Sequence, residues 1–313
     1  MAIEKHDQTR MWKDLHPKVR RRAESIMKDV TFKDGKAIYN KTGEDVSHIV
    51  DVGLKATEKQ VRRLKALDDL SQHQLENGGF IIAFFKQLNT IEQRFPTLTK
   101  QDTARLLFIG TFIAWETNRL QADNGRIIER KKLEGLVEMS TKRFNEFFKR
   151  LEDEGIIRET KSGELFINPT VFYRGEIKNH PYDTSDFKYT RIFRETVRDL
   201  YKQFSGRTLA QLSVIYSVIP FLNFDTNIVS VNPEETVEDL IEPMNLVDLA
   251  ELLGYVDASS LKRTLNRIKV DGKPVFGFFE NPHDRRQYRI VINPRVIFAG
   301  NGDSLRAIKA LFN

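Results

Sequence analysis

The sequence predicts a mainly α-helical fold with small β wings, an α+β chain in which two related domains follow an N-terminal appendage. Two observations lead to this prediction. The phrase INPTVFYRG at residues 167–175 returns as INPRVIFAG at residues 292–300, and the same order of helices and strands precedes each copy. A length of 313 residues agrees with two domains of roughly 100–200 residues each.

In the first repeat, one helix has a clear amphipathic pattern. Its apolar residues recur at i, i+3, i+4 and i+7, at Phe144, Phe147, Phe148 and Leu151. Ser140 is placed to cap this helix and Gly155 to end it. In chain order we expect an apolar helix over residues 99–120, a strand over 125–131, a short helix over 131–139, the capped helix over 141–155 and a hairpin over 156–168.

The second repeat predicts the same order of elements. Asn245 and Asp257 are placed as helix caps, and Gly272 as the end of the third helix. We expect an apolar helix over residues 206–223 that bends or ends near Pro220, a strand over 226–231, a short helix over 245–255, a helix over 258–272 and a hairpin over 274–293.

The register of the two repeats agrees. Matching positions lie 117 residues apart in the third helix and its end, as in the pairs Phe144 and Leu261, Phe148 and Leu265, Leu151 and Ile268, and Gly155 and Gly272. The closing phrases lie 125 residues apart, so the second hairpin is expected to be eight residues longer. The Asn-Pro of each phrase is expected to end the second hairpin strand, with the apolar residues beyond it packing on the core.

This order of elements is the winged-helix form of the helix-turn-helix. We place the first winged-helix domain at residues 77–175 and the second at 191–313, which opens with a helix over 191–204. A linker or docking strand is expected at 176–190. Residues 1–75 are expected to form an appendage of a basic helix, a small hairpin and a second helix.

Composition favours an anionic partner. The net charge is +6 and the calculated pI about 9.3, a balance that suits nucleic acid above all. The chain has no cysteine, which excludes a disulfide framework, a thiolate zinc site and a cysteine nucleophile. The N-terminal residues lack the apolar stretch of a signal peptide, and the longest apolar run is too short for a membrane helix, so we expect a cytoplasmic protein without a membrane partner.

A recognition helix lies in the major groove with its N-terminal residues at the base edges, while other residues contact phosphate. Arg and Lys address guanine, Asn pairs with adenine, and Ser or Thr contacts base or phosphate. In the first repeat these criteria select Thr141, Lys142, Arg143, Asn145, Lys149 and Arg150 on the helix, and Arg158 and Lys161 on the wing. In the second repeat they select Ser259, Ser260, Lys262, Arg263, Asn266 and Arg267 on the helix, and His283, Arg285 and Arg286 at the wing tip.

Other interpretations of these features stay open. Any surface helix carries a charged face, and winged helices also serve to dock proteins or to form dimers. The basic residues 20–22 suit either a phosphate contact or a solvated helix face. The acidic stretch at residues 232–243 suits either a solvated loop or a contact for a basic partner.

Motifs for catalysis are missing. The six histidines show no metal-binding spacing, and the chain has no phosphate-binding glycine loop, dinucleotide fingerprint or serine-nucleophile elbow. The stretch HDRRQY at residues 283–288 is better explained by phosphate contacts than by a strand-cleaving centre. We therefore expect no enzyme activity, no metal and no cofactor.

The tandem order resembles that of plasmid and phage replication initiators that bind repeated elements at an origin. The first repeat is also similar to the helix-turn-helix region of RepL-type plasmid replication proteins of low-GC Gram-positive bacteria. There too a helix-turn-helix is followed by G-I-I (here residues 155–157), a short wing and a closing N-P-x-x-F-x-x-G (here residues 168–175). The second likeness covers only the first repeat.

The resemblance implies non-catalytic, sequence-specific binding of double-stranded DNA at direct repeats, with recruitment of host replication proteins. Two alternatives need the same DNA-reading surface: a phage or plasmid transcription regulator that binds an operator, and a DNA segregation adaptor. Formation of a homodimer is also open. The sequence does not separate these roles.

Overall fold

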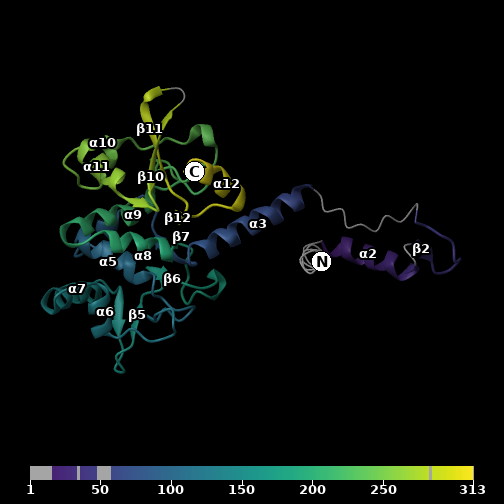
Figure 1. Ribbon diagram of the computed structural model, residues 1–313, viewed down its shortest axis with the longest axis horizontal. Coiled ribbons are helices and arrows are strands. Elements are labelled where there is room, and N and C mark those ends of the chain that lie inside the picture. The colour runs from purple at the N-terminus through teal and green to yellow at the C-terminus, as the bar shows by residue number, and fades with distance from the viewer. Residues whose placement is uncertain (1–15, 34–35, 48–57, 282–283, 313) are drawn as a thin grey trace. The chain divides into compact units, whose positions relative to one another are not determined.

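The computed structural model describes residues 16–33, 36–47, 58–281 and 284–312 (Figure 1). The fold is mixed α+β, as expected. The chain divides into two compact units, Met1–Lys65 and Ala66–Asn313. In the described part of the chain, no helix is both long and apolar enough to cross a membrane.

The first compact unit contains the expected basic helix and hairpin. Helix α2 (Pro17–Asp29) begins with a proline, whose fixed φ suits the first turn of a helix. Strands β1 (Val30–Lys33) and β2 (Lys36–Tyr39) form an antiparallel pair. Helix α3 (Glu58–Glu76), the second helix expected here, begins in this unit and continues into the second one.

A four-stranded antiparallel sheet joins the two repeats in the second compact unit. Its order is β12-β7-β3-β6, from strands β3 (Phe80–Phe85), β6 (Phe172–Tyr173), β7 (Lys188–Phe193) and β12 (Ile297–Phe298). Each repeat supplies one long strand at its start and one two-residue strand from its closing phrase.

The register of the central strand pair shows an approximate two-fold relation between the repeats. Ile82 of β3 pairs with Arg191 of β7, which lies 109 residues later. The same offset separates Asn118 and Asn227, two buried asparagines with matching hydrogen bonds in the two repeats, so Ile82 and Arg191 are equivalent positions. On either side of this pair, Ile81 pairs with Ile192 and Ala83 with Thr190. Because each strand thus pairs with its own equivalent running the opposite way, the two repeats face each other across a pseudo-dyad.

The remaining elements of the first repeat follow the expected order. Thr99 caps helix α5 through a reciprocal capping box with Asp102, which explains why the helix starts there. The helices are α4 (Ile91–Arg94), α5 (Lys100–Gly110), α6 (Arg130–Leu136) and α7 (Thr141–Asp153), and the hairpin strands are β4 (Ile157–Glu159) and β5 (Leu165–Ile167). A 3₁₀ turn, η1 (Ile177–Asn179), lies between the repeats.

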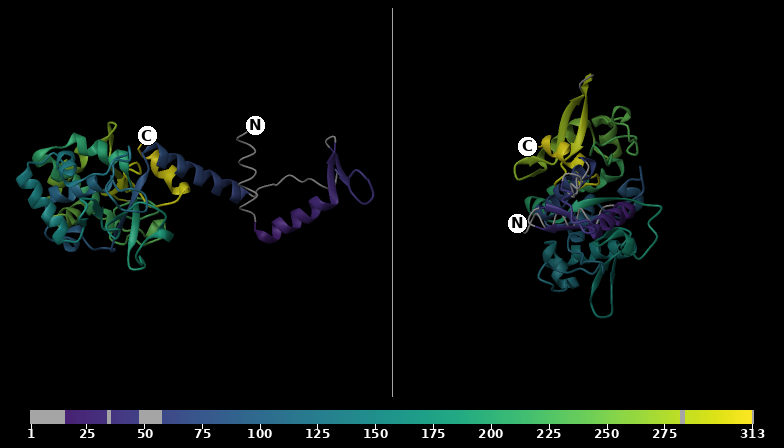
Figure 2. Two further views of the ribbon diagram at one scale, coloured as in Figure 1. Left: turned by 90° about the horizontal axis from the view of Figure 1, so that it is seen from below. Right: turned by 90° about the vertical axis from the view of Figure 1, so that its right-hand side faces the viewer.

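In the second repeat, the chain forms more and shorter elements. The helices are α8 (Arg194–Gln203), η2 (Gly206–Leu212), α9 (Ser213–Ser217), η3 (Ile219–Phe221), η4 (Glu238–Leu240), α10 (Leu246–Leu252), α11 (Ala258–Arg267) and α12 (Gly302–Ala310). The strands other than β7 and β12 are β8 (Lys269–Val270), β9 (Lys273–Pro274), β10 (Phe276–Asn281) and β11 (Asp284–Ile292). The hairpins β4–β5 and β10–β11 project from opposite ends of the unit (Figure 2).

The closing phrase of each repeat is held by one buried asparagine. The Asn118 side-chain amide donates hydrogen bonds to the carbonyl oxygens of Ile167 (3.0 Å) and Phe172 (2.6 Å). Asn227 donates the matching pair, of 3.0 and 2.8 Å, to the carbonyls 125 positions further along. These bonds fix the end of the second hairpin strand and the start of the short sheet strand, so the repeated phrase marks the same structural junction twice.

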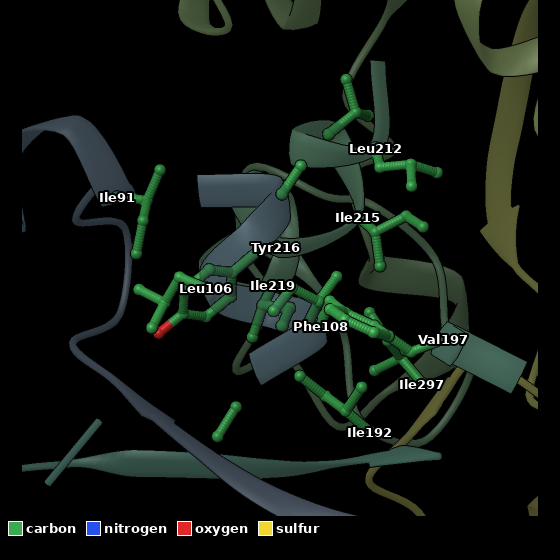
Figure 3. Close-up of a cluster of buried hydrophobic side chains, with 14 of the residues drawn as sticks. Ile91, Leu106, Phe108, Ile192, Val197, Leu212, Ile215, Tyr216, Ile219 and Ile297 are labelled. Carbon is green, nitrogen blue, oxygen red and sulfur yellow. The ribbon is translucent and has the colours of Figure 1, made fainter. Parts of the chain in front are cut away.

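A single hydrophobic cluster runs through both repeats. Helix α5 packs against η2 and α9, and the Phe108 ring stacks on Tyr201 of α8 with centroids 3.8 Å apart. Figure 3 shows side chains of both repeats in this cluster, among them Leu106, Ile192, Val197, Ile215, Tyr216 and Ile297. The repeats therefore share a core.

Several expected boundaries are wrong. The helix expected over residues 206–223 is broken into η2, α9 and η3, with Pro220 in the last of these. The helix expected over 99–120 ends at Gly110, and the chain then turns so that Ile113 bridges Leu120. Residues 125–129 and 226–231 form only isolated bridges, and residues 130–131 already belong to α6. Residues 191–193 belong to strand β7 rather than to a helix, because the sheet supplies partners that local pattern does not reveal.

The eight residues by which the offset between the repeats grows from 117 to 125 fall in two places. The Asn168 amide donates to the Gly155 carbonyl, and Asn293 donates to Pro274, so the start of the hairpin is offset by 119 and its end by 125. Two residues therefore lie before the hairpin and six within it. Gly272 does not end α11, which stops at Arg267; with a φ of 78° it forms the tight turn between β8 and β9.

Candidate nucleic-acid interface

The exposed face of α7 carries most of the site residues predicted in the first repeat. Phe144, Phe147, Phe148 and Leu151 are buried, as the helical spacing predicted. The opposite face exposes Thr141, Lys142, Arg143, Asn145 and Lys149. No hydrogen bond or ion pair joins the three cationic side chains of this set to another described residue, so they are available to a ligand.

A neighbouring arginine that the sequence did not indicate organises this face. Arg130 of α6 donates to Asn145 (3.1 Å), pairs with Glu159 of β4 (3.4 Å) and stacks over the Phe148 ring at 4.2 Å from its centroid. It thereby links the short helix, the longer helix and the hairpin. Thr141 also has a partner, donating to Glu134 at 2.6 Å.

Arg150 differs from the other cations predicted on α7 because it has an ion-pair partner. Its guanidinium pairs with the buried carboxylate of Asp102, with Nε and Nη2 each 3.0 Å from Oδ2. Asp102 is part of the capping box of α5, so the pair fastens α7 to α5. The phosphate contact expected of Arg150 remains a prediction.

The two longer helices differ at their N-termini. Ser140 occupies the N-cap position of α7 but its side chain makes no capping hydrogen bond. Asp257 caps α11 by accepting a hydrogen bond from the Ser260 amide at 2.6 Å. The first turn of α7 has no acidic residue, and amides at such a terminus favour anions.

In the first hairpin, both predicted residues are exposed. The Arg158 guanidinium lies over the Phe166 ring, 4.6 Å from its centroid. Lys161 lies in the turn between β4 and β5, where Gly163 has a φ of 80°. The stacked arginine is held in place, whereas the lysine extends from the tip.

Helix α11 presents the corresponding face in the second repeat. Leu261 and Leu265 are buried, and Ser259, Arg263, Asn266 and Arg267 are exposed. Ser260 and Lys262 are half-buried, and the Lys262 ammonium lies 4.9 Å from the Tyr288 ring centroid and 5.5 Å from that of Phe278. Lys262 thus connects α11 to the hairpin β10–β11, leaving Arg263 and Arg267 as the exposed cations of this helix.

The predicted tip of the second hairpin is described only in part. His283 lies outside the described residues. Arg285 and Arg286 belong to strand β11, but their side chains are outside the described part of the chain. Their expected phosphate contacts remain predictions.

The short helices α6 and α10 carry opposite charges next to the exposed faces of α7 and α11. Lys131 and Lys132 are exposed on α6, whereas Asp248 and Glu251 are exposed on α10. The first face therefore has the larger cationic excess. Two residues before α11, Val256 is an exposed apolar side chain that the sequence did not indicate.

The structure does not bring the two sets of residues into one centre. The pairs α6–α7 and α10–α11 lie on either side of α5, α8 and α9, so they form two separate surfaces (Figure 1). The basic residues 20–22 lie in α2 of the other compact unit. The acidic stretch at 232–243 contains η4 and is joined to β7 by an ion pair between Glu234 and Lys188 at 3.0 Å.

Within the described ranges, no three His, Asp or Glu side chains gather as a metal site would require. Comparison of the chain with protein-family models, with curated proteins and with solved structures gave no match.

Proposed function

We propose that this protein binds double-stranded DNA in a sequence-specific manner through two winged-helix domains. The observation that carries the proposal is the presence of two exposed, cation-bearing helix faces at matching positions of an internal repeat. In each repeat a short helix, a turn, a longer amphipathic helix and a two-stranded hairpin follow in the order of a winged helix.

The pseudo-dyad of the central sheet makes the proposal more specific. A two-fold relation between recognition helices favours half-sites in opposite orientation, as operator symmetry mirrors protein symmetry. The two faces differ in sequence and charge, so we expect the half-sites to differ as well. One molecule would therefore read a composite, imperfectly inverted element.

We further propose that such elements are repeated at a plasmid or phage replication origin. This role rests on the resemblance to tandem winged-helix initiators, and the arrangement of target sites tests it. Direct repetition of the composite element near one origin supports an initiator. A single element at a promoter indicates a transcription regulator.

The experiment is selection of bound genomic fragments by the purified protein at two salt concentrations. Phosphate contacts make affinity fall with salt, whereas base contacts preserve the preference among sequences. Binding without sequence preference would indicate a segregation or architectural role. Absence of binding at both salt concentrations would contradict the proposal and leave two protein-docking domains.

Variants of single residues then show whether each helix face contacts bases or phosphates. Arg143→Ala and Arg263→Ala are expected to cost about 1–3 kcal/mol, roughly 5- to 150-fold in Kd, for the selected site and less for random DNA. Lys161→Ala should weaken all sequences alike and reduce the salt dependence. Lys202→Ala, an exposed lysine on α8, is the control and should leave both affinities unchanged.

A further inference from the structure

A pocket of about 550 Å³ is lined by residues of the first repeat and by Arg194 of α8, and no residue of α7 or α11 belongs to its lining. Arg119, Arg174, Arg194, Asp123 and Trp115 are among its lining residues. Its volume lies within the range of ligand pockets, roughly 300–1,000 Å³. Trp115 is 55% exposed, so its ring is accessible from solvent.

The second repeat serves as an internal comparison for three of these positions. Ile228 occupies the place of Arg119, 109 residues later, and Ala299 that of Arg174, 125 residues later. Both equivalents are uncharged, although the backbone around them makes the same hydrogen bonds in the two repeats. The fold thus does not require arginine at either position.

The position of Trp115 also differs between the two repeats. Phe224 is the equivalent of Trp115, and its ring packs on Phe85 with centroids 6.0 Å apart. The equivalent of Phe85 is Arg194, which lines the pocket with Trp115. In the second repeat the ring is covered by a phenylalanine, whereas in the first repeat the matching ring is exposed beside an arginine.

The pocket has more positive than negative charge. Asp123 is the one acidic lining residue, and it accepts hydrogen bonds from Arg194 (2.6 Å) and from Arg198. The Arg174 guanidinium donates to the Ile113 carbonyl (3.2 Å) and forms no ion pair with another described residue. Burial lowers the pKa of Arg174, and the neighbouring Arg194 and Arg198 lower it further against the opposing effect of Asp123.

Arg119 is a second arginine of the lining whose hydrogen-bond donors are only partly satisfied. Its Nη1 atom pairs with Glu164 at 2.8 Å, but its buried Nε atom has no acceptor among the described residues. Arginine binds phosphate through two parallel N–H groups, and an exposed indole ring stacks on a nucleobase. The lining therefore offers arginine side chains for a phosphate group and an aromatic ring for a base, which are the two groups that a nucleotide-binding site needs.

We propose that this pocket binds a nucleotide, with its phosphate against Arg174 and Arg119 and its base against the Trp115 ring. The nucleotide can come from two sources, a free mononucleotide or a residue of single-stranded nucleic acid. The chemistry of recognition is the same for both, and the length of the ligand distinguishes them.

Trp115 supplies the readout, because Trp12 is the other tryptophan of the chain. In a full-length Trp12→Phe protein, fluorescence is followed on addition of ATP, dTMP, inorganic phosphate or a ten-residue oligo-dT. We expect quenching by a mononucleotide or by the oligonucleotide. A mononucleotide response indicates a free-nucleotide site, and a response to oligo-dT alone indicates a strand-binding site.

Calorimetry with variants checks the assignment. Arg174→Ala and Trp115→Ala should each weaken binding at least tenfold, and Arg174→Lys should weaken it less than Arg174→Ala. Arg207→Ala, an exposed arginine outside the pocket lining, should bind as the parent does. Circular dichroism and thermal unfolding show whether each variant is folded.

Three results would overturn the proposal: no binding of any nucleotide, equal binding by Arg174→Ala and the parent, or binding of inorganic phosphate as tight as that of nucleotides. The test is separate from that of duplex recognition, since Arg143→Ala should bind nucleotide normally.

Discussion

Asn118 and Asn227 combine a backbone requirement with a bonding requirement. Each has a φ of 56°, in the left-handed region where asparagine is enriched among non-glycine residues. Each is buried and donates to two backbone carbonyls of its closing phrase. A replacement therefore loses the bonds and is strained at the same position.

Asn227→Ala should lower the free energy of unfolding by about 2–4 kcal/mol, because two buried carbonyls lose their donor and alanine disfavours a positive φ. Urea denaturation measures this change. Asn266→Ala, at an exposed position of α11, is the matched control and should stay within about 0.5 kcal/mol of the parent. Equal stability of the two variants would show that the Asn227 bonds contribute nothing net.

His73 makes the stability of the protein depend on pH. Its Nε2–H donates to the Pro294 carbonyl at 2.9 Å, and its Nδ1 accepts from Asn77 at 3.3 Å, so the folded state holds the neutral ring. Burial lowers the pKa of His73 below its usual range. In the unfolded chain the ring has its ordinary pKa, about 6.5, so the unfolded state binds more protons below that pH.

We therefore expect stability to be complete above about pH 7 and to fall as the pH is lowered through 6.5. Urea denaturation at pH 7.5 and at pH 5.5 measures how much the free energy of unfolding changes between the two pH values. His73→Gln, which retains a donor for Pro294 but does not titrate, should show a smaller loss between the two pH values. A variant with the parent's slope would assign the pH dependence to other groups.

At the scale of the elements, local pattern predicted the amphipathic helices but not the central sheet. Helices α7 and α11 begin at their expected residues because capping positions and the i, i+3, i+4 spacing are encoded within the segment. Strand β3 reads FIIAFF, which lacks the alternation of a half-buried strand. Strands β6 and β12 have two residues each, too short to leave a pattern.

For the candidate interface, too, the sequence predicted what depends on the helical period and not what depends on tertiary contacts. Exposure of the cations on α7 and α11 follows from the helical period. The ion pair of Arg150 was not predicted, because its partner, Asp102, lies 48 residues earlier and is brought close only by packing of α7 on α5. Arg130 was missed for the same reason, since its contacts on α7 and β4 belong to the tertiary fold.

The uncapped N-terminus of α7 gives a prediction in which stability and binding change in opposite directions. Ser140→Asp adds a capping carboxylate, which should stabilise the protein by up to about 1 kcal/mol. The same charge should repel phosphate and weaken DNA binding several-fold. Thermal unfolding and DNA titration measure the two effects.

Ser140→Ala is the control for that variant. It removes no capping hydrogen bond, so stability should change by less than about 0.5 kcal/mol. Unchanged DNA affinity in Ser140→Asp would place the N-terminus of α7 away from the DNA backbone.

At the scale of the whole molecule, Asp123 fastens the two repeats to each other. It lies in the first repeat and accepts hydrogen bonds from Arg194 and Arg198 of α8 in the second. Burial alone would raise the pKa of Asp123, but the bonds from the two arginines lower it below its ordinary value. The contribution of this carboxylate to stability is thus present above the unfolded-state pKa and is lost as the pH falls through the folded-state pKa.

Asp123→Asn should accordingly unfold more readily than the parent at pH 7, and the difference should shrink as the medium is acidified below about pH 4. Denaturation of both proteins at pH 7, 5 and 3 measures this. Asp199→Asn, an exposed carboxylate on α8 paired with Lys202 alone among described residues, is the control. A difference that persists at pH 3 would show that charge is not its cause.

The bond between His73 and Pro294 has a consequence for biosynthesis. The two residues are 221 positions apart, and the edge strand β12 begins three residues after Pro294. At roughly 5–20 residues per second, a ribosome makes the second partner about 10–45 seconds after the first. During that interval His73 lacks its carbonyl acceptor, and β7, once it has been made, lacks β12 at its edge for the roughly 100 residues between the two strands. An unpaired strand edge is a template for pairing with another chain, so the nascent protein is open to aggregation at the edge of β7 until β12 is made.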